Sequence, residues 1–133
     1  SWGGAPRLLM EDDRMAMFII SGSRGTDDPT MASLPFMAAK TAKEQGHDVV
    51  LWLWNEAVTS ARKGSADHIV GVNLTPLKDV LAAVQAAQIP IWVCAACAVA
   101  RQIGPGDLVT GAVIKGMPDY IKAVAERDRN VAF

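Results

Sequence analysis

The sequence predicts an α/β fold, a three-layer α/β/α sandwich with a mainly parallel sheet of about five strands. Short apolar runs bounded by turn residues alternate along the chain with longer segments whose apolar residues recur at the helical period. The apolar runs are continuous, which is typical of strands that are covered by helices on both faces. The chain of 133 residues is long enough for one domain with a proper core. We expect residues 1–15 to form a flexible tail and residues 16–133 a single α/β domain.

The first strand and helix have clear boundary signals. Residues 16–21, AMFIIS, are an apolar run that is closed by the turn-rich stretch GSRGTDDP, so they predict a buried strand. Asp28 and Pro29 are the residue types of a helix N-cap and of a first helical position. We expect this helix to continue to about Gln45 and to end at Gly46.

The same alternation predicts the remaining elements. Each apolar run is followed by a segment with helical periodicity, and the last run is short enough for an edge strand. The expected strands are residues 48–54, 89–94, 107–114 and 130–133, and the expected helices are residues 55–62, 76–87, 95–103 and 117–128.

Composition narrows the classes of partner. The 13 basic and 14 acidic side chains give a net charge of −1 without a basic stripe, so nucleic acid is not an expected partner. No apolar run reaches the roughly 20 residues that a bilayer crossing needs, so no membrane association is expected. Half of the residues are hydrophobic, which predicts self-association through residues such as Trp54, Val58 and 69–74.

The cellular compartment is inferred from the N-terminal residues and the cysteines. The first residues, SWGGAPRLLMEDDRMAM, lack a basic segment followed by a long apolar core, so we predict no secretory signal. The chain has two cysteines, and we expect it to work in a reducing cytoplasm. A CxxC pair in that compartment favours a chemical role over a structural disulfide.

The strongest candidate site is the stretch WVCAACAVARQIG, which contains Cys94 and Cys97. Chemistry in open α/β sheets collects where the carboxyl ends of strands meet helix N-termini, and Cys94 is expected at such a junction. Unpaired N–H groups and the helix dipole favour a thiolate there. Cys97, one helical turn later, would lie on roughly the same face, so the two sulfurs could approach each other. Inert packing of small residues stays an alternative for both cysteines, and more so for Cys97.

Other residues are weaker candidates. A structural zinc site commonly has four ligands in two pairs, and with no second CxxC and two isolated histidines, His47 and His68, we predict no metal. Thioredoxin-type dithiol exchange stays open, because a CxxC that begins a helix is its signature. Arg24, in the loop after the first strand, is a candidate substrate-binding residue if the first and third strands are neighbours. Arg101 is expected to cap a helix or to form an ion pair rather than to contact sulfur.

Several further motifs are spread along the chain. They are the loop Gly22–Pro29, Cys94 with Arg101 seven residues later, Gly111, Gly116, Met117 and the terminal Phe133. In combination these motifs resemble the DsrE/DsrF-like (TusD-related) family of small sulfur-relay proteins. The resemblance covers about residues 17–133. One departure is Gln102, where many relatives have glycine after the arginine.

The resemblance implies a function as a sulfur carrier or sulfurtransferase. It implies a five-stranded α/β/α domain that forms homotrimers or homohexamers and carries sulfur as a persulfide on the strand-end cysteine, here Cys94. The role of Cys97 stays open, and no cofactor is expected. The expected partners are sulfur donor and acceptor proteins, such as TusA-like or rhodanese-like carriers. The alternatives are a non-catalytic partner-binding subunit of a sulfur-relay complex and a CxxC dithiol redox protein.

Overall fold

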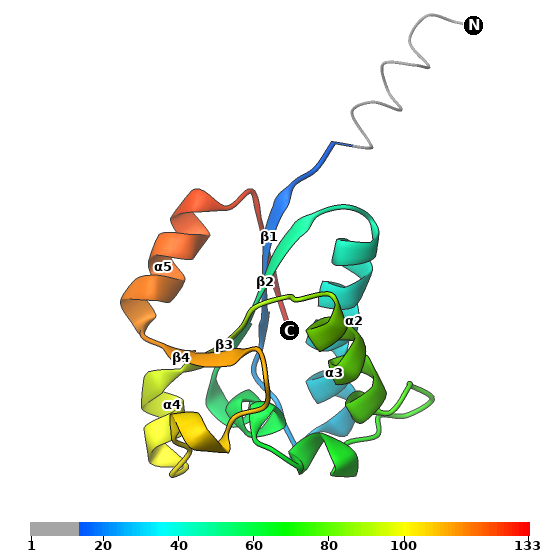
Figure 1. Cartoon of the computed structure of the whole chain (residues 1–133), viewed down its shortest axis with the longest axis vertical. Coiled ribbons are helices and arrows are strands. Elements are labelled where there is room, and N and C mark those ends of the chain that lie inside the picture. The colour runs from blue at the N-terminus through cyan, green and yellow to red at the C-terminus, as the bar shows by residue number, and fades with distance from the viewer. Residues whose placement is uncertain (1–13) are drawn as a thin grey trace, which may run out of the picture.

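Five strands form one parallel sheet in the order β4-β3-β2-β1-β5 (Figure 1). The structure is a computed structural model and describes residues 14–133, so nearly all of the expected tail lies outside the described residues. All four strand pairings are parallel, so the carboxyl ends of the five strands lie at one edge of the sheet. The strands are β1 (Met17–Gly22), β2 (Asp48–Leu53), β3 (Ile91–Cys94), β4 (Ala112–Lys115) and β5 (Arg129–Ala132).

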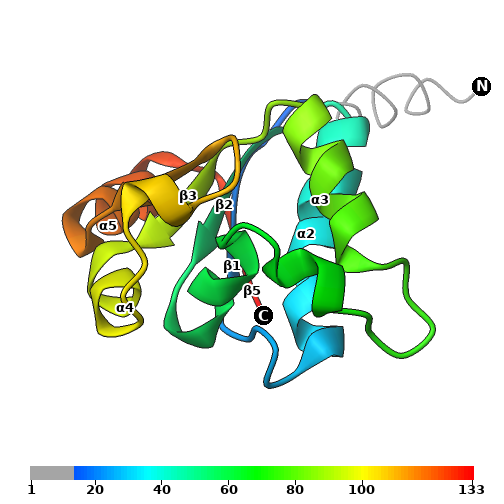
Figure 2. The same ribbon diagram turned by 60° about the horizontal axis from the view of Figure 1, so that its bottom comes forward.

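Helices cover both faces of this sheet, which confirms the three-layer α/β/α fold. Figures 1 and 2 show α2 and α3 side by side on one face, with α4 and α5 on the other. Among the described residues, no helix combines the length and the apolar character that a membrane crossing needs. The helices are α2 (Pro29–Glu44), α3 (Leu77–Ala86), α4 (Ala95–Ala100) and α5 (Met117–Glu126), with 3-10 helices η1 (Asn55–Ala61), η2 (Ser65–His68) and η3 (Pro105–Asp107).

Most element boundaries agree with the predictions. The side chain of Asp28 caps α2, accepting a hydrogen bond from the backbone N–H of Met31 at 3.1 Å. The predicted strand over residues 107–114 is the main difference, because β4 begins only at Ala112. The residues before it form η3 and then a turn in which Gly111 has a φ of +89°, a conformation that interrupts an extended chain.

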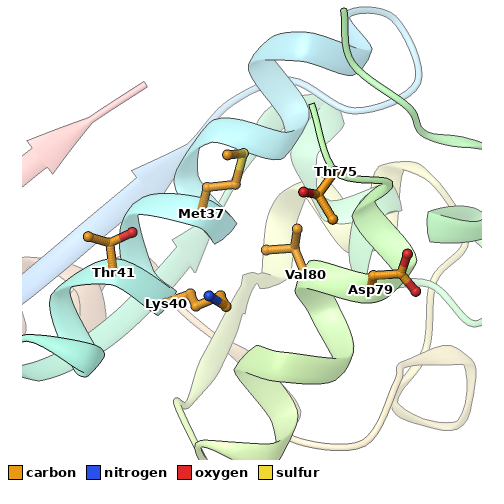
Figure 3. Close-up of a pocket in the computed structure, with 6 residues that line it drawn as sticks. All are labelled: Met37, Lys40, Thr41, Thr75, Asp79 and Val80. Carbon is orange, nitrogen blue, oxygen red and sulfur yellow. The ribbon is translucent and has the colours of Figure 1, made fainter. Parts of the chain in front are cut away.

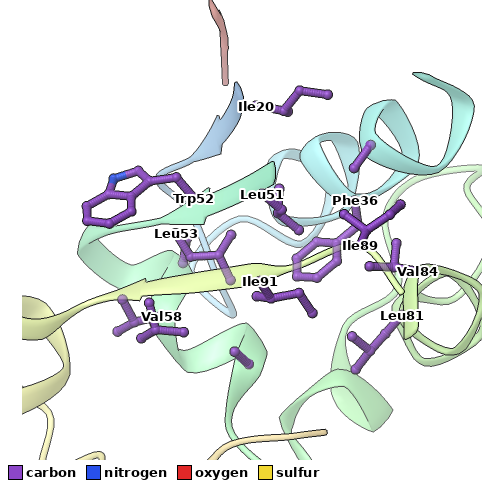
Figure 4. Close-up of a cluster of buried hydrophobic side chains, with 14 of the residues drawn as sticks. Ile20, Phe36, Leu51, Trp52, Leu53, Val58, Leu81, Val84, Ile89 and Ile91 are labelled. Atoms are coloured by element: carbon purple, nitrogen blue, oxygen red, sulfur yellow. The ribbon is translucent and has the colours of Figure 1, made fainter. Parts of the chain in front are cut away.

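The larger part of the core lies between the sheet and the α2–α3 layer. Figure 4 shows Phe36 of α2 packed with strand residues such as Leu51 and Ile91, and all three are fully buried. Val58 and Ile69 are also fully buried within the chain, so the expectation that they contact another subunit is wrong. Their side chains are part of the core of this domain.

Aromatic side chains fix α5 to the opposite face of the sheet. The ring of Trp52, which is fully buried in β2, stacks on Tyr120 of α5 with 4.7 Å between the ring centroids. Trp54, just after β2, lies 4.9 Å from the same tyrosine ring. Aromatic pairs of this kind stabilise by about 0.5–1.5 kcal/mol beyond the area they bury. The carboxyl end of β2 is therefore held firmly on both faces.

Candidate functional site

Cys94 lies at the junction between a central strand and a helix, as the sequence predicted. It is the last residue of β3 and the N-cap residue of α4, with extended backbone angles of φ −58° and ψ 122°. The residue is only 4% exposed, whereas Cys97 in α4 is partly exposed, and both are free cysteines. The pair therefore has an inner thiol and an outer thiol at the carboxyl edge of the sheet.

A backbone hydrogen bond from the neighbouring strand holds the outer thiol. The N–H of Asn55 donates to Sγ of Cys97, with 3.0 Å between nitrogen and sulfur. Asn55 comes just after β2 and has a φ of +53°, in the left-handed region that asparagine tolerates better than most residues. Its side-chain amide donates in turn to the carbonyl oxygen of Ser23, after β1, at 2.9 Å. The chain ends of β1 and β2 and the CxxC helix are thus linked through one residue.

Asn55 was not among the site residues predicted from the sequence. The available signal was an asparagine placed directly after a buried strand, where a left-handed turn is common. Its contact with Cys97 joins residues 42 positions apart, so it depends on the order of the strands.

The surroundings of Cys97 favour its protonated form. Burial raises the pKa of the Cys97 thiol, and the neighbouring Cys94 raises it further through a hydrogen bond and through its charge. The Asn55 N–H and the positive charge of Arg101 act in the opposite direction, but the net shift of this pKa is upward. The protonated thiol is therefore the favoured form of Cys97.

Arg101 fixes the end of α4 to the segment that follows β2. Its Nε donates to the Glu56 carboxylate at 2.8 Å, and its Nη1 donates to the carbonyl oxygen of Cys97 at 3.1 Å. Both side chains of this ion pair are about two thirds buried or more, and Glu56 raises the pKa of the guanidinium. Arg101 thus caps and pairs, as the sequence predicted, instead of contacting sulfur.

The Arg24 loop lies next to these residues, but its guanidinium has a different partner. Nη1 of Arg24 is 3.2 Å from the Asp27 carboxylate, and the Arg24 side chain is 53% exposed. The Asp27 carboxylate also accepts the Gly25 N–H at 2.8 Å, and this bond is the main reason why its pKa is lowered. Gly25 itself lies against η1, since an added Cβ would be 2.4 Å from the Glu56 carbonyl oxygen. The first and third strands are not neighbours, because β2 lies between them, so the condition on which Arg24 was predicted to bind substrate is not met. Substrate binding by Arg24 stays an untested prediction.

The two histidines lie outside this cluster. Nδ1 of His47 accepts a hydrogen bond from the N–H of Ala16 at 3.0 Å, close to the start of β1 and therefore at the other edge of the sheet. His68 ends η2. In residues 14–133, no three His, Cys, Asp or Glu side chains are grouped so that they could hold a metal ion.

A separate hollow of about 200 Å³ lies between α2 and α3. Figure 3 shows the side chains of the two helices across it. It is on the face of the sheet opposite α4, so it is not part of the cysteine site (Figure 2). Its lining consists of Met37, Lys40, Thr41, Thr75, Asp79 and Val80.

Comparison with known proteins shows the family of this chain. The model of the DsrE/DsrF-like family matches residues 15–133. The chain belongs to the DsrE/DsrF-like family. This family is associated in general with sulfur relay. No curated protein matches the sequence of this DsrE/DsrF-like chain.

A solved structure supports the same fold. The crystal structure of the ychN protein from E. coli superimposes with a TM-score of 0.76 and 20% sequence identity, covering 90% of this chain and 100% of that one. At this identity the likeness supports the architecture, and the chemistry has to be argued from the residues of the present chain.

Proposed function

We propose that this DsrE/DsrF-like protein is a sulfur carrier that holds sulfane sulfur as a persulfide on Cys94 and passes it to a cysteine of an acceptor protein. The observation that carries the proposal is the thiol pair at the carboxyl edge of the parallel sheet, in a chain of a sulfur-relay family. Cys94 ends the strand, and Cys97 stands beside it with a raised pKa.

The loading step is an exchange between two S–S bonds. The Cys94 thiolate attacks the outer sulfur of a donor persulfide, R–S–SH, and forms a new S–S bond. The S–S bond of the donor breaks, and its electron pair leaves on the donor thiolate, R–S⁻. The product is Cys94–S–SH, with the proton retained on the outer sulfur. Release repeats the reaction with an acceptor thiolate as nucleophile and Cys94 as the leaving thiolate, so the cycle involves no net oxidation.

The burial of Cys94 suits a carrier. The inner sulfur belongs to a residue that is 4% exposed, while a persulfide places its outer sulfur about 2 Å farther out. A sheltered inner sulfur is protected from attack by solvent thiols, and the outer sulfur is the atom that has to be transferred. The arrangement thus favours transfer over cleavage at the inner sulfur.

Cys97 has two roles in this proposal. We expect its S–H to donate a hydrogen bond to Cys94 and to stabilise that thiolate when it leaves during release. The second role is restraint. A Cys97 thiolate would attack the inner sulfur of the persulfide, expel hydrosulfide and close a Cys94–Cys97 disulfide. Because burial and Cys94 raise the pKa of Cys97, little thiolate forms, and this loss of sulfur is slow.

The hydrogen bond from Cys97 is needed because the helix contributes less than the sequence suggested. α4 has only six residues, and the side chain of Cys94 makes no capping hydrogen bond within the described part of the chain. A helix of under two turns aligns few peptide dipoles, so its N-terminus stabilises a thiolate weakly.

The proposal extends to partners. The donor and the acceptor are expected to be proteins that carry a persulfide or a reactive cysteine, such as TusA-like or rhodanese-like carriers. The chain is expected to work in the cytoplasm as a homotrimer or homohexamer. Val70 and Val72, which are 55% and 83% exposed, are apolar residues that such an assembly would cover.

Polysulfide loading followed by mass spectrometry tests the function. The parent chain and the Cys97→Ser variant should gain sulfur on Cys94, and Cys94→Ser should gain none while keeping its fold, since serine is similar in size and suits a helix cap. Cleavage after lysine and arginine leaves both cysteines in residues 79–101, so fragmentation of that peptide must assign the added sulfur.

Two results would contradict the proposal. Loading of Cys94→Ser at Cys97, at the rate of the parent chain, would make Cys97 the carrier. Loss of two hydrogens without any gain of sulfur would identify a dithiol couple instead.

A further inference from the structure

Asn55 is the residue through which the outer thiol is attached to the sheet. Its N–H is 3.0 Å from Cys97 Sγ, and its own side chain is bonded to the Ser23 carbonyl oxygen at 2.9 Å. Ser23 is fixed in turn, because its hydroxyl donates to the carbonyl oxygen of Phe133 at 2.9 Å. A chain of three hydrogen bonds therefore runs from the β5 edge of the sheet to the cysteine helix.

The turn at Asn55 has an uncommon backbone conformation. Its N–H follows Trp54, whose backbone is extended (φ −133°, ψ 177°), and the φ of +53° at Asn55 turns the chain that follows into η1. Non-glycine residues rarely adopt this region, so the side-chain bond to Ser23 is what makes it favourable here. Without that bond the left-handed turn loses the side-chain contact that favours it, and the N–H of Asn55 is held less firmly against Cys97.

We propose that Asn55 is a positioning residue of the site, whose anchored left-handed turn aims a backbone N–H at Cys97 Sγ, holds this thiol beside Cys94 and stabilises negative charge on it. The inference deepens the proposed sulfur carrier and rests on it for its biological meaning. A backbone N–H aimed at sulfur keeps the lone pairs of Cys97 occupied and leaves its S–H free to donate to Cys94. The same N–H stabilises any thiolate that forms at Cys97.

Titratable groups also act on Cys97, directly or through a neighbour, and they must stay constant in a test of Asn55. The substitution of Asn55 by an uncharged residue alters none of these groups. A change in the ionisation of Cys97 then measures the weakening of its hydrogen bond from the Asn55 N–H. Cys94 from β3 and Arg101 from α4 act on Cys97 itself. The groups beyond them are Glu56 from η1 and Asp27 from the loop after β1, which act on Arg101, Arg24, which pairs with Asp27, and Lys115 of β4, the register partner of Cys94.

The test measures the pH dependence of alkylation of Cys97 by iodoacetamide in a Cys94→Ser background, where Cys97 is the only cysteine of the chain. Asn55→Gly removes the anchor but tolerates a positive φ, and Asn55→Ala removes the anchor and adds backbone strain. Both should raise the midpoint of the profile by about one pH unit, a roughly tenfold loss of thiolate at pH values below it. The fold of each variant is checked by circular dichroism, and the glycine variant carries the test if alanine does not fold.

Asn73→Ala is the matched control. Asn73 has a φ of +57° and is exposed in the segment before α3, where the N–H of Val72 bonds to Thr30 of α2. Asn73→Ala places alanine at a similar positive φ, so it introduces the same backbone strain on the other face of the sheet. It should leave the midpoint of the Cys97 alkylation profile unchanged. An unshifted midpoint in folded Asn55→Gly would overturn the positioning role, and so would an equal shift in Asn73→Ala. The failure of the parent chain to take up sulfur would refute the carrier function and leave the alkylation result standing.

Discussion

Replacing Gly25 by alanine is expected to destabilise the protein and to disturb the cysteine site from a distance. An added Cβ would lie 2.4 Å from the Glu56 carbonyl oxygen and 2.5 Å from Thr59 Oγ1. The backbone oxygen cannot rotate away as a flexible side chain does, so η1 must shift. Overpacking of this kind typically costs about 1–3 kcal/mol, and the contact with backbone places Gly25→Ala near 2 kcal/mol.

The loss can be measured by urea unfolding and by heat. At about 2.1 cal/mol/K per residue, a chain of 133 residues has an unfolding entropy near 0.28 kcal/mol/K, so 2 kcal/mol lowers the Tm by roughly 7 °C. Gly106→Ala is the control, because nothing lies within 4 Å of its added Cβ, and it should stay within about 0.5 kcal/mol of the parent chain. The rate of Cys97 alkylation should change in Gly25→Ala alone, since η1 begins at Asn55.

A Gly25→Ala variant as stable as Gly106→Ala would refute this reasoning. It would mean that the loop after β1 does not pack against η1, so Gly25 would not help to position Asn55 and Glu56 beside the cysteines.

Two further predictions concern acid stability and assembly. The pKa of Asp27 is lowered mainly by the Gly25 N–H, so this carboxylate stabilises the fold above its ordinary value of 3.8, and the contribution disappears as the pH falls through the lower folded-state pKa. The urea midpoint of Asp27→Asn should therefore lie below that of the parent chain at neutral pH and converge with it in acid; a constant gap across this range would contradict the assignment. Light scattering at micromolar concentration should give the mass of a trimer or hexamer, and a monomer mass would refute the assembly.

Features that depend on neighbouring residues were predictable from the sequence. Asp28 and Pro29 form the cap that their types suggest, because an N-cap needs only its own next turn. The continuous apolar runs predicted the parallel sheet. The position of Cys94 at the end of a strand was predicted from one apolar run and from the helical segment that follows it. Each of these inferences uses a few consecutive residues.

Features that depend on the strand order were not predictable. The bond from Asn55 to Cys97 requires β2 and β3 to be neighbours. The residue types in these two strands do not indicate which strand pairs with which. The close approach of Gly25 to Glu56 has the same origin. The burial of Val58 could not be foreseen either, because an apolar residue in a short helical segment suits a core and a subunit contact equally well.

The strand order also explains why two consecutive residues connect the whole site. β2 lies between β1 and β3, so the segment after it faces the loop after β1 on one side and α4 on the other. Asn55 bonds to Ser23 and to Cys97, and Glu56 contacts Gly25 and Arg101. The fully buried ring of Trp52 fixes β2 in the core by stacking on Tyr120. The contacts of Asn55 and Glu56 therefore restrain the outer thiol relative to a rigid strand. Burial and Cys94 raise the pKa of Cys97 by more than the Asn55 N–H lowers it, so the restrained thiol stays protonated, and this is what a carrier needs to hold a persulfide without closing a disulfide.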